Sequence, residues 1–65
     1  MQIVSTIRAG YVIKTEDNRF MVEGSMSIRG RYVYLVKDQS GRKVSLGRED
    51  VLQAQREGSA QVLAA

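Results

Sequence analysis

Residues 31–46 read RYVYLVKDQSGRKVSL, and they carry the strongest secondary-structure signal in the chain. β-Branched and aromatic residues occupy positions 32–36 and alternate toward two faces, as the residues of a strand do. The polar residues 38–41 interrupt the pattern, and a second alternating run follows at residues 43–46. Asp, Ser and Gly favour turns, because they hydrogen-bond locally or accept a positive φ. The stretch therefore predicts a β-hairpin with its turn at residues 38–41.

Three further strands are expected on the N-terminal side of this hairpin, at residues 2–8, 11–13 and 20–28. In the last of them the apolar residues fall on even positions, a period of two that predicts one buried face. That face would carry Phe20, Val22, Met26 and Ile28. Gly24 has the same phase and marks a bend or a bulge.

A short helix is expected after the hairpin. Ser45 or Gly47 can cap its start, and Glu49 and Asp50 fall in its first turn, where the helix dipole favours negative charge. Gly58 is a suitable residue for its C-cap, so the helix would span about ten residues and must pack on the sheet to be stable. The fold class expected is mainly β, with about five short antiparallel strands forming a small barrel or an intertwined sheet, and a short C-terminal helix.

Length and composition predict one small domain over residues 1–58 and a flexible tail over residues 59–65. The chain has 65 residues, with ten Lys plus Arg against seven Asp plus Glu, and it contains no Cys, His or Pro. A homodimer is expected, because so short a chain usually needs a partner when disulfides and zinc are excluded. No apolar run is long enough for a membrane helix and no signal peptide is recognisable, so a cytoplasmic location is expected.

No motif in the chain indicates catalysis, and we predict that the protein is not an enzyme. Without His or Cys, neither a His-based acid–base pair nor a Cys–His nucleophile can form. The glycines do not have the spacing of a nucleotide-binding loop. We therefore predict no catalytic residue, no metal site and no cofactor.

The basic residues are the strongest functional signal. A net charge of +3 permits nucleic-acid binding without requiring it. Basic residues at expected turns and strand ends suit phosphates and base edges, and these are Arg8, Arg29, Arg31, Arg42, Lys43 and Arg48. Tyr11, Tyr32 and Tyr34 have rings on which unpaired bases can stack. Two other interpretations stay open: tyrosines that cover the sheet beside solvated arginines, or protein recognition through an exposed strand edge.

Residues 44–53, VSLGREDVLQ, resemble the carbon storage regulator (Csr/Rsm) family of bacterial post-transcriptional regulators. In that family a Val-Ser-Val strand precedes Arg-Glu-Glu-Ile-x-Gln at the start of a C-terminal helix, and the length and the start of the chain are also similar. The resemblance implies an intertwined homodimer that binds RNA loops containing GGA and blocks ribosome access. It implies that Arg48 contacts RNA, that Arg8 is a displaced partner, and that the binding edge is lined by Val4, Val44, Ser45 and Leu46.

Two functions follow from these observations. The first is an RNA-binding, homodimeric repressor of translation, with RNA favoured over DNA and with Arg29 and Arg31 as further contacts. The second is an SH3-like small β-barrel of the accessory type found on phages and plasmids, which binds DNA or a protein partner, for example as an inhibitor. Thr6 and Ile7 stand where the regulator family has a basic pair, and this departure favours the second function.

Overall fold

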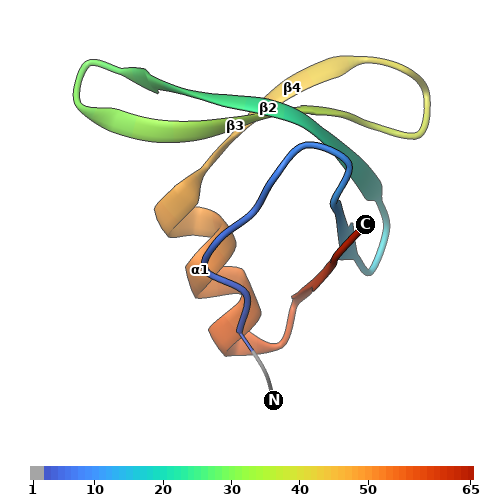
Figure 1. Cartoon of the computed structure of the whole chain (residues 1–65). Coiled ribbons are helices and arrows are strands. Elements are labelled where there is room, and N and C mark those ends of the chain that lie inside the picture. The colour runs from blue at the N-terminus through green and yellow to red at the C-terminus, as the bar shows by residue number, and fades with distance from the viewer. Residues whose placement is uncertain (1–2) are drawn as a thin grey trace.

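The computed structural model describes residues 3–65, which form five strands and one helix (Figure 1). Every pair of neighbouring strands is antiparallel, in the order β4-β3-β2-β1-β5, and the predicted fold class is confirmed. In chain order the elements are β1 (Val12–Thr15), β2 (Arg19–Ile28), β3 (Arg31–Lys37), β4 (Lys43–Gly47), α1 (Arg48–Glu57) and β5 (Ala60–Leu63). In Figure 1 the hairpins of β2, β3 and β4 form one layer, and α1 lies below it beside residues 3–8.

The turn predicted at residues 38–41 is confirmed, and β3 and β4 pair on either side of it. Asp38 organises the turn: its Oδ1 accepts hydrogen bonds from the backbone N–H groups of Ser40 (3.0 Å) and Arg42 (2.9 Å). Gly41 adopts a φ of 88°, a conformation that glycine accepts without strain. Local interactions thus account for the hairpin that the sequence predicted most strongly.

A β-bulge in β2 lies at Glu23, next to the glycine that predicted it. Val22 pairs with Val36, whereas Gly24 pairs with Leu35, the adjacent residue of β3. Glu23 is therefore an extra residue with no partner of its own in the ladder. An extra residue bends the strand and reverses the alternation of side chains beyond it.

The bulge divides the apolar residues of β2 between two faces. Val22 is 2% exposed and Phe20 packs against the core, but Met26 and Ile28 are 45% and 43% exposed. The prediction that all four share one buried face is wrong, because the alternation shifts by one residue at Glu23. We call the face of β2–β4 that carries Val22 and Tyr34 the inner face, and the face that carries Met26 the outer face.

Residues 3–8 are not a strand, although the sequence predicted one over residues 2–8, of which Gln2 lies outside the described residues. Gln55 of α1 holds this segment instead. Its Oε1 accepts a hydrogen bond from the N–H of Val4 (2.8 Å), and its Nε2 donates one to the C=O of Val4 (2.9 Å). One amide side chain thus supplies the pair of bonds that a neighbouring strand would supply, while Ile7 enters the core.

Residues 60–63, which were expected in a flexible tail, form β5 and pair with β1. Gly58 ends α1 with a φ of 81°, and the chain then returns toward β1. Val62 is buried in the core. The tail prediction over residues 59–65 is corrected accordingly: the folded domain continues through β5 instead of ending at residue 58. Local propensity did not indicate this strand, because its stability comes from pairing with a distant segment.

The helix predicted after the hairpin is confirmed as α1. Gly47 is its N-cap, Glu49 and Asp50 lie in its first turn, and Gly58 is its C-cap. α1 packs its buried Val51 into one core that draws on the N-terminal segment, the sheet and β5, and whose members are Ile7, Ile13, Val22, Tyr34, Val36, Val51 and Val62. The helix of residues 3–65, α1, does not have the length and apolarity needed to cross a membrane.

Candidate nucleic-acid interface

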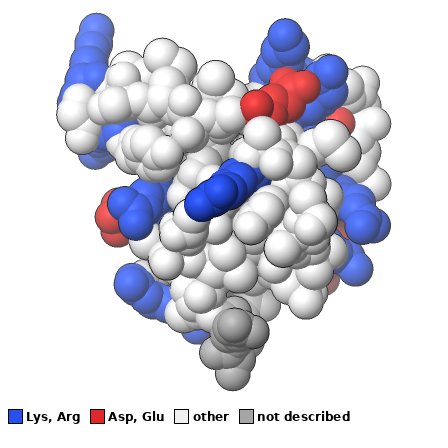
Figure 2. Space-filling view, viewed as in Figure 1, with Lys and Arg blue, Asp and Glu red and all other residues white. Residues whose placement is uncertain are grey.

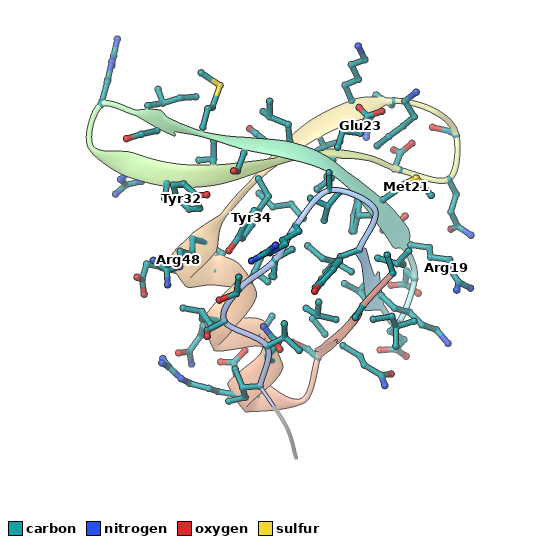
Figure 3. The ribbon with its side chains drawn as sticks, in the orientation of Figure 1. Arg19, Met21, Glu23, Tyr32, Tyr34 and Arg48 are labelled. Atoms are coloured by element: carbon teal, nitrogen blue, oxygen red, sulfur yellow. The ribbon has the colours of Figure 1, made fainter. Side chains whose placement is uncertain are left out.

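Arg48 and Tyr32 meet where β4 continues into α1 (Figure 3). The last pair of the β3–β4 ladder is Val33 with Gly47, so the next residue on each side, Tyr32 and Arg48, lie opposite each other. The guanidinium carbon of Arg48 is 5.9 Å from the centroid of the Tyr32 ring, at the outer limit of a cation–π contact. The turn into the helix therefore places a cation beside an aromatic ring.

The two tyrosines of the inner face have different surroundings. Their rings meet edge to face, with centroids 5.7 Å apart and planes at 82°. Tyr34 is 2% exposed and belongs to the core, whereas Tyr32 is 45% exposed. The hydroxyl oxygen of Tyr32 lies 2.8 Å from Oγ of Ser25, which fixes the direction of the ring. Tyr34 thus covers the core and supports Tyr32, whose ring is accessible to a ligand.

Arg48 forms no ion pair within the described residues. The two ion pairs in residues 3–65 lie elsewhere and join Lys37 Nζ to Glu23 Oε2 (3.5 Å) and Arg42 Nε to Asp38 Oδ2 (3.6 Å). Burial raises the pKa of Tyr34, while the nearby positive charge of Arg48 acts in the opposite direction. Arg48 is exposed beside the ring of Tyr32, and its charge is available to an anionic or polar ligand.

Two surface hollows adjoin the pair of Tyr32 and Arg48, and both residues line both hollows. The smaller has a volume of about 230 Å³ and is closed on its other side by residues 5–7 and Tyr34. The larger has a volume of about 540 Å³ and is lined by residues 30–33 and 47–50. It contains Arg31 as well as two carboxylates of the first turn of α1, so it offers both hydrogen-bond donors and acceptors.

Four predicted site residues fall at or near this surface. Arg31 and Arg48 line the larger hollow. Arg29 lies in the two-residue turn between β2 and β3, directly before Gly30, which lines that hollow. Arg8 is exposed and follows Ile7 of the smaller hollow. The structure therefore brings Arg31 and Arg48 to one hollow, and it places Arg29 and Arg8 next in sequence to residues that line the two hollows.

The other predicted site residues do not share this surface. Val4, Val44 and Leu46 pack against the core. Ser45 is exposed on the outer face, opposite Leu35 of β3. Alternate residues of a strand point to opposite faces, so a run such as residues 44–46 cannot place all its side chains on one binding surface.

Sequence reasoning did not identify Ser5, Thr6 and Ser25 as neighbours of the aromatic ring. Ser5 and Thr6 line the smaller hollow, because Gln55 holds their segment beside α1. Ser25 faces Tyr32 only because the bulge reverses the alternation in β2. A bulge was expected near Gly24. A bulge moves the residues after it to the opposite face, and this was the one signal in the sequence that could have placed Ser25 beside Tyr32.

The cationic side chains are distributed around the molecule. Figure 2 shows Lys and Arg spread over the visible face and its margins, with no single large basic patch. Within residues 3–65 no group of His, Cys, Asp and Glu side chains is placed to hold a metal ion. Comparisons with protein-family models, curated proteins and solved structures found no match for the chain. The resemblance to carbon storage regulators stays a prediction.

Proposed function

We propose that the chain binds single-stranded nucleic acid, RNA rather than DNA, through the surface formed by Arg31, Tyr32 and Arg48. We call this the Tyr32–Arg48 surface. The observation that carries the proposal is the exposed ring of Tyr32 beside the guanidinium of Arg48, which forms no ion pair within residues 3–65. Base stacking on an aromatic ring contributes about 1–3 kcal/mol per base.

The character of this surface favours unpaired bases over a duplex. An unpaired base can stack on a ring and present its polar edge to neighbouring side chains, whereas the bases of a duplex are already stacked and paired. The larger hollow contains Arg31 and Arg48 together with Glu49 and Asp50, so it can donate to and accept from a base edge. The same two carboxylates disfavour a ligand that consists of phosphate alone.

RNA is the preferred ligand in this proposal because residues 44–53 resemble carbon storage regulators, and Arg48 matches the RNA-contacting arginine of that family. Repression of translation and action as a homodimer follow from the same resemblance. A homodimer would use surfaces other than β1, since β1 is already paired with β2 on one side and with β5 on the other.

Fluorescence anisotropy with a labelled, unstructured RNA of about 12 nucleotides tests the proposal; this length lies within the range of about 4–16 nucleotides that a single OB fold binds. We expect Tyr32→Ala to weaken binding about tenfold, a loss that corresponds to the stacking of one base. Tyr32→Phe is the matched control: it keeps the ring and removes only the hydroxyl that contacts Ser25. Its affinity should stay close to that of the wild type.

Three outcomes would contradict the proposal: no binding by the wild type, equal binding by Tyr32→Ala, or tighter binding to DNA of the same sequence. Arg56→Ala controls for the loss of one positive charge, since Arg56 lies in the last turn of α1, at the other end of the helix from Arg48. An RNA hairpin with GGA in its loop, compared with one that lacks GGA, tests the finer expectation from the family resemblance.

A further inference from the structure

We infer that Arg29, at the tip of the β2–β3 hairpin, binds a phosphate of the nucleic acid whose base stacks on Tyr32; the inference rests on the proposed function. Arg29 has a φ of 51°, and within residues 3–65 it is the one residue other than glycine with a positive φ. Backbone strain of this kind persists where the surroundings enforce it, and it is concentrated at functional sites.

The turn itself calls for a different residue. Ile28 pairs with Arg31, which leaves Arg29 and Gly30 as a two-residue turn, with φ values of 51° and 78°. Two-residue hairpin turns with positive φ at both positions strongly favour Asn, Asp or Gly at the first position. Residues other than Gly are disfavoured there, because the Cβ approaches the following carbonyl oxygen, and only short polar side chains such as Asn and Asp offset this cost with local hydrogen bonds. Gly30 suits its position, and Arg29 does not.

Nothing in the fold compensates for this strain through the side chain of Arg29. The residue is exposed, and its guanidinium takes part in no ion pair and no side-chain hydrogen bond within the described residues. The strain is therefore not offset by a contact inside the domain. The guanidinium of Arg29 is therefore free to contact a ligand outside the chain.

The charges around the tip indicate phosphate as that ligand. Residues 24–36 contain Arg29 and Arg31 and no Asp or Glu, so this half of the hairpin is purely cationic. The hollow beside Arg48 differs, because it also contains the carboxylates of Glu49 and Asp50. The tip is two positions beyond Tyr32 along the hairpin, about 7 Å at about 3.3 Å per residue. A strand with a base on Tyr32 can therefore pass its flanking phosphates by Arg29 while polar groups at Arg48 contact base edges.

Arg29→Asn is the test, because it should change stability and binding in opposite directions. Asn accepts the positive φ, so the melting temperature should rise by roughly 2–6 °C for a domain of this size. Anisotropy with the single-stranded RNA should give an affinity about three- to tenfold lower at low salt. One lost phosphate contact should also make the slope of log affinity against log salt shallower by about 0.7.

Two further variants separate the outcomes. Arg29→Lys keeps the charge and the strained backbone, and it should retain most of the affinity and the wild-type salt slope. Unchanged affinity and slope in Arg29→Asn would overturn the inference, whatever the melting temperature, and the proposed function would stand if Tyr32→Ala still weakened binding. Absence of RNA binding by the wild type would instead refute the proposed function and this inference together. A loss in Arg29→Asn that Arg29→Lys shares in full would show that charge is not the reason, and would also overturn the inference.

Discussion

Beyond the bulge, the face of the β2–β3 hairpin that leads into the core is more polar than the face exposed to solvent, although hydrophobicity alone would predict the reverse. The inner face, toward α1, carries Ser25, Ser27, Tyr32 and Tyr34, and the outer face carries Met26, Ile28, Val33 and Leu35. The face with more hydroxyl groups leads into the core, while large apolar side chains are exposed on the other. One extra residue, Glu23, determines this assignment because it shifts the alternation of the whole strand end.

The candidate site and the core are therefore parts of one surface. The inner face begins with buried Val22 and Val36, continues to the buried ring of Tyr34, and ends at the exposed ring of Tyr32. A surface that changes from core to solvent along one strand can hold an aromatic ring rigidly and still expose it. The outer face offers apolar area but few groups that could orient a polar ligand.

The largest difference in stability is expected between substitutions of two neighbouring residues of β3 that lie on opposite faces. We expect Tyr34→Ala to destabilise the domain by about 3–5 kcal/mol, as truncation of a large buried side chain does, which is comparable to the whole stability of so small a domain. Leu35→Ala, one residue further on and 37% exposed, should cost less than about 1 kcal/mol. Urea unfolding followed by circular dichroism measures both, and similar losses would mean that the two faces are not distinct.

An intermediate effect is expected from the helix that closes the inner side. Gln55→Leu keeps the size of the side chain but leaves the N–H and C=O of Val4 unpaired, which should cost about 1–3 kcal/mol. Gln53→Leu is the control, since Gln53 is exposed and donates only to Glu57 of the same helix (3.1 Å). The control should change stability by no more than about 0.5 kcal/mol.

Hydrogen exchange locates the effect of Gln55→Leu. If the Val4 amide exchanges faster in Gln55→Leu than in the wild type, and amides in β3 do not, then residues 3–8 have lost their attachment to α1. Equal protection of the Val4 amide in the wild type and in Gln55→Leu would contradict the structural role assigned to this side chain.

The fold could be predicted from the sequence where local interactions determine it. The Asp38 turn and the caps of α1 depend on residues within a few positions of one another, and both were predicted. β5 and the N-terminal segment depend on distant partners, β1 and Gln55, which no local pattern reveals. The bulge was expected near Gly24, yet its consequence for Met26 and Ile28 was missed, because the even spacing of apolar residues continues through it.

The candidate site was predictable as a set of residue types and not as a geometry. Arg48, Arg31 and the tyrosines were identified because guanidinium groups and rings suit nucleic acid wherever they lie. That Tyr32 is open while Tyr34 is buried depends on how far the β3–β4 ladder extends before α1 begins. Val4, Val44 and Leu46 were assigned to a binding edge, whereas their side chains pack against the core.

The smallest effect is expected from the turn that sets the register of β3 against β4, and it should depend on pH. Hydrogen bonds from the Ser40 side chain and from the backbone N–H of Arg42 lower the pKa of Asp38 below its ordinary value of 3.8. A carboxyl whose pKa is lowered by folding stabilises the fold fully above its ordinary pKa, and this contribution is lost as the pH falls through the lower, folded pKa.

The wild type should therefore be more stable than D38N at neutral pH, since the amide accepts the same bonds without a charge. Melting temperatures of the two proteins, measured stepwise downward from pH 3.8, should converge as Asp38 becomes protonated. A difference that stays constant with pH would mean that the carboxylate charge does not stabilise this turn, and that Gly41 and the strand pairing alone set the register that turns Val44 and Leu46 inward.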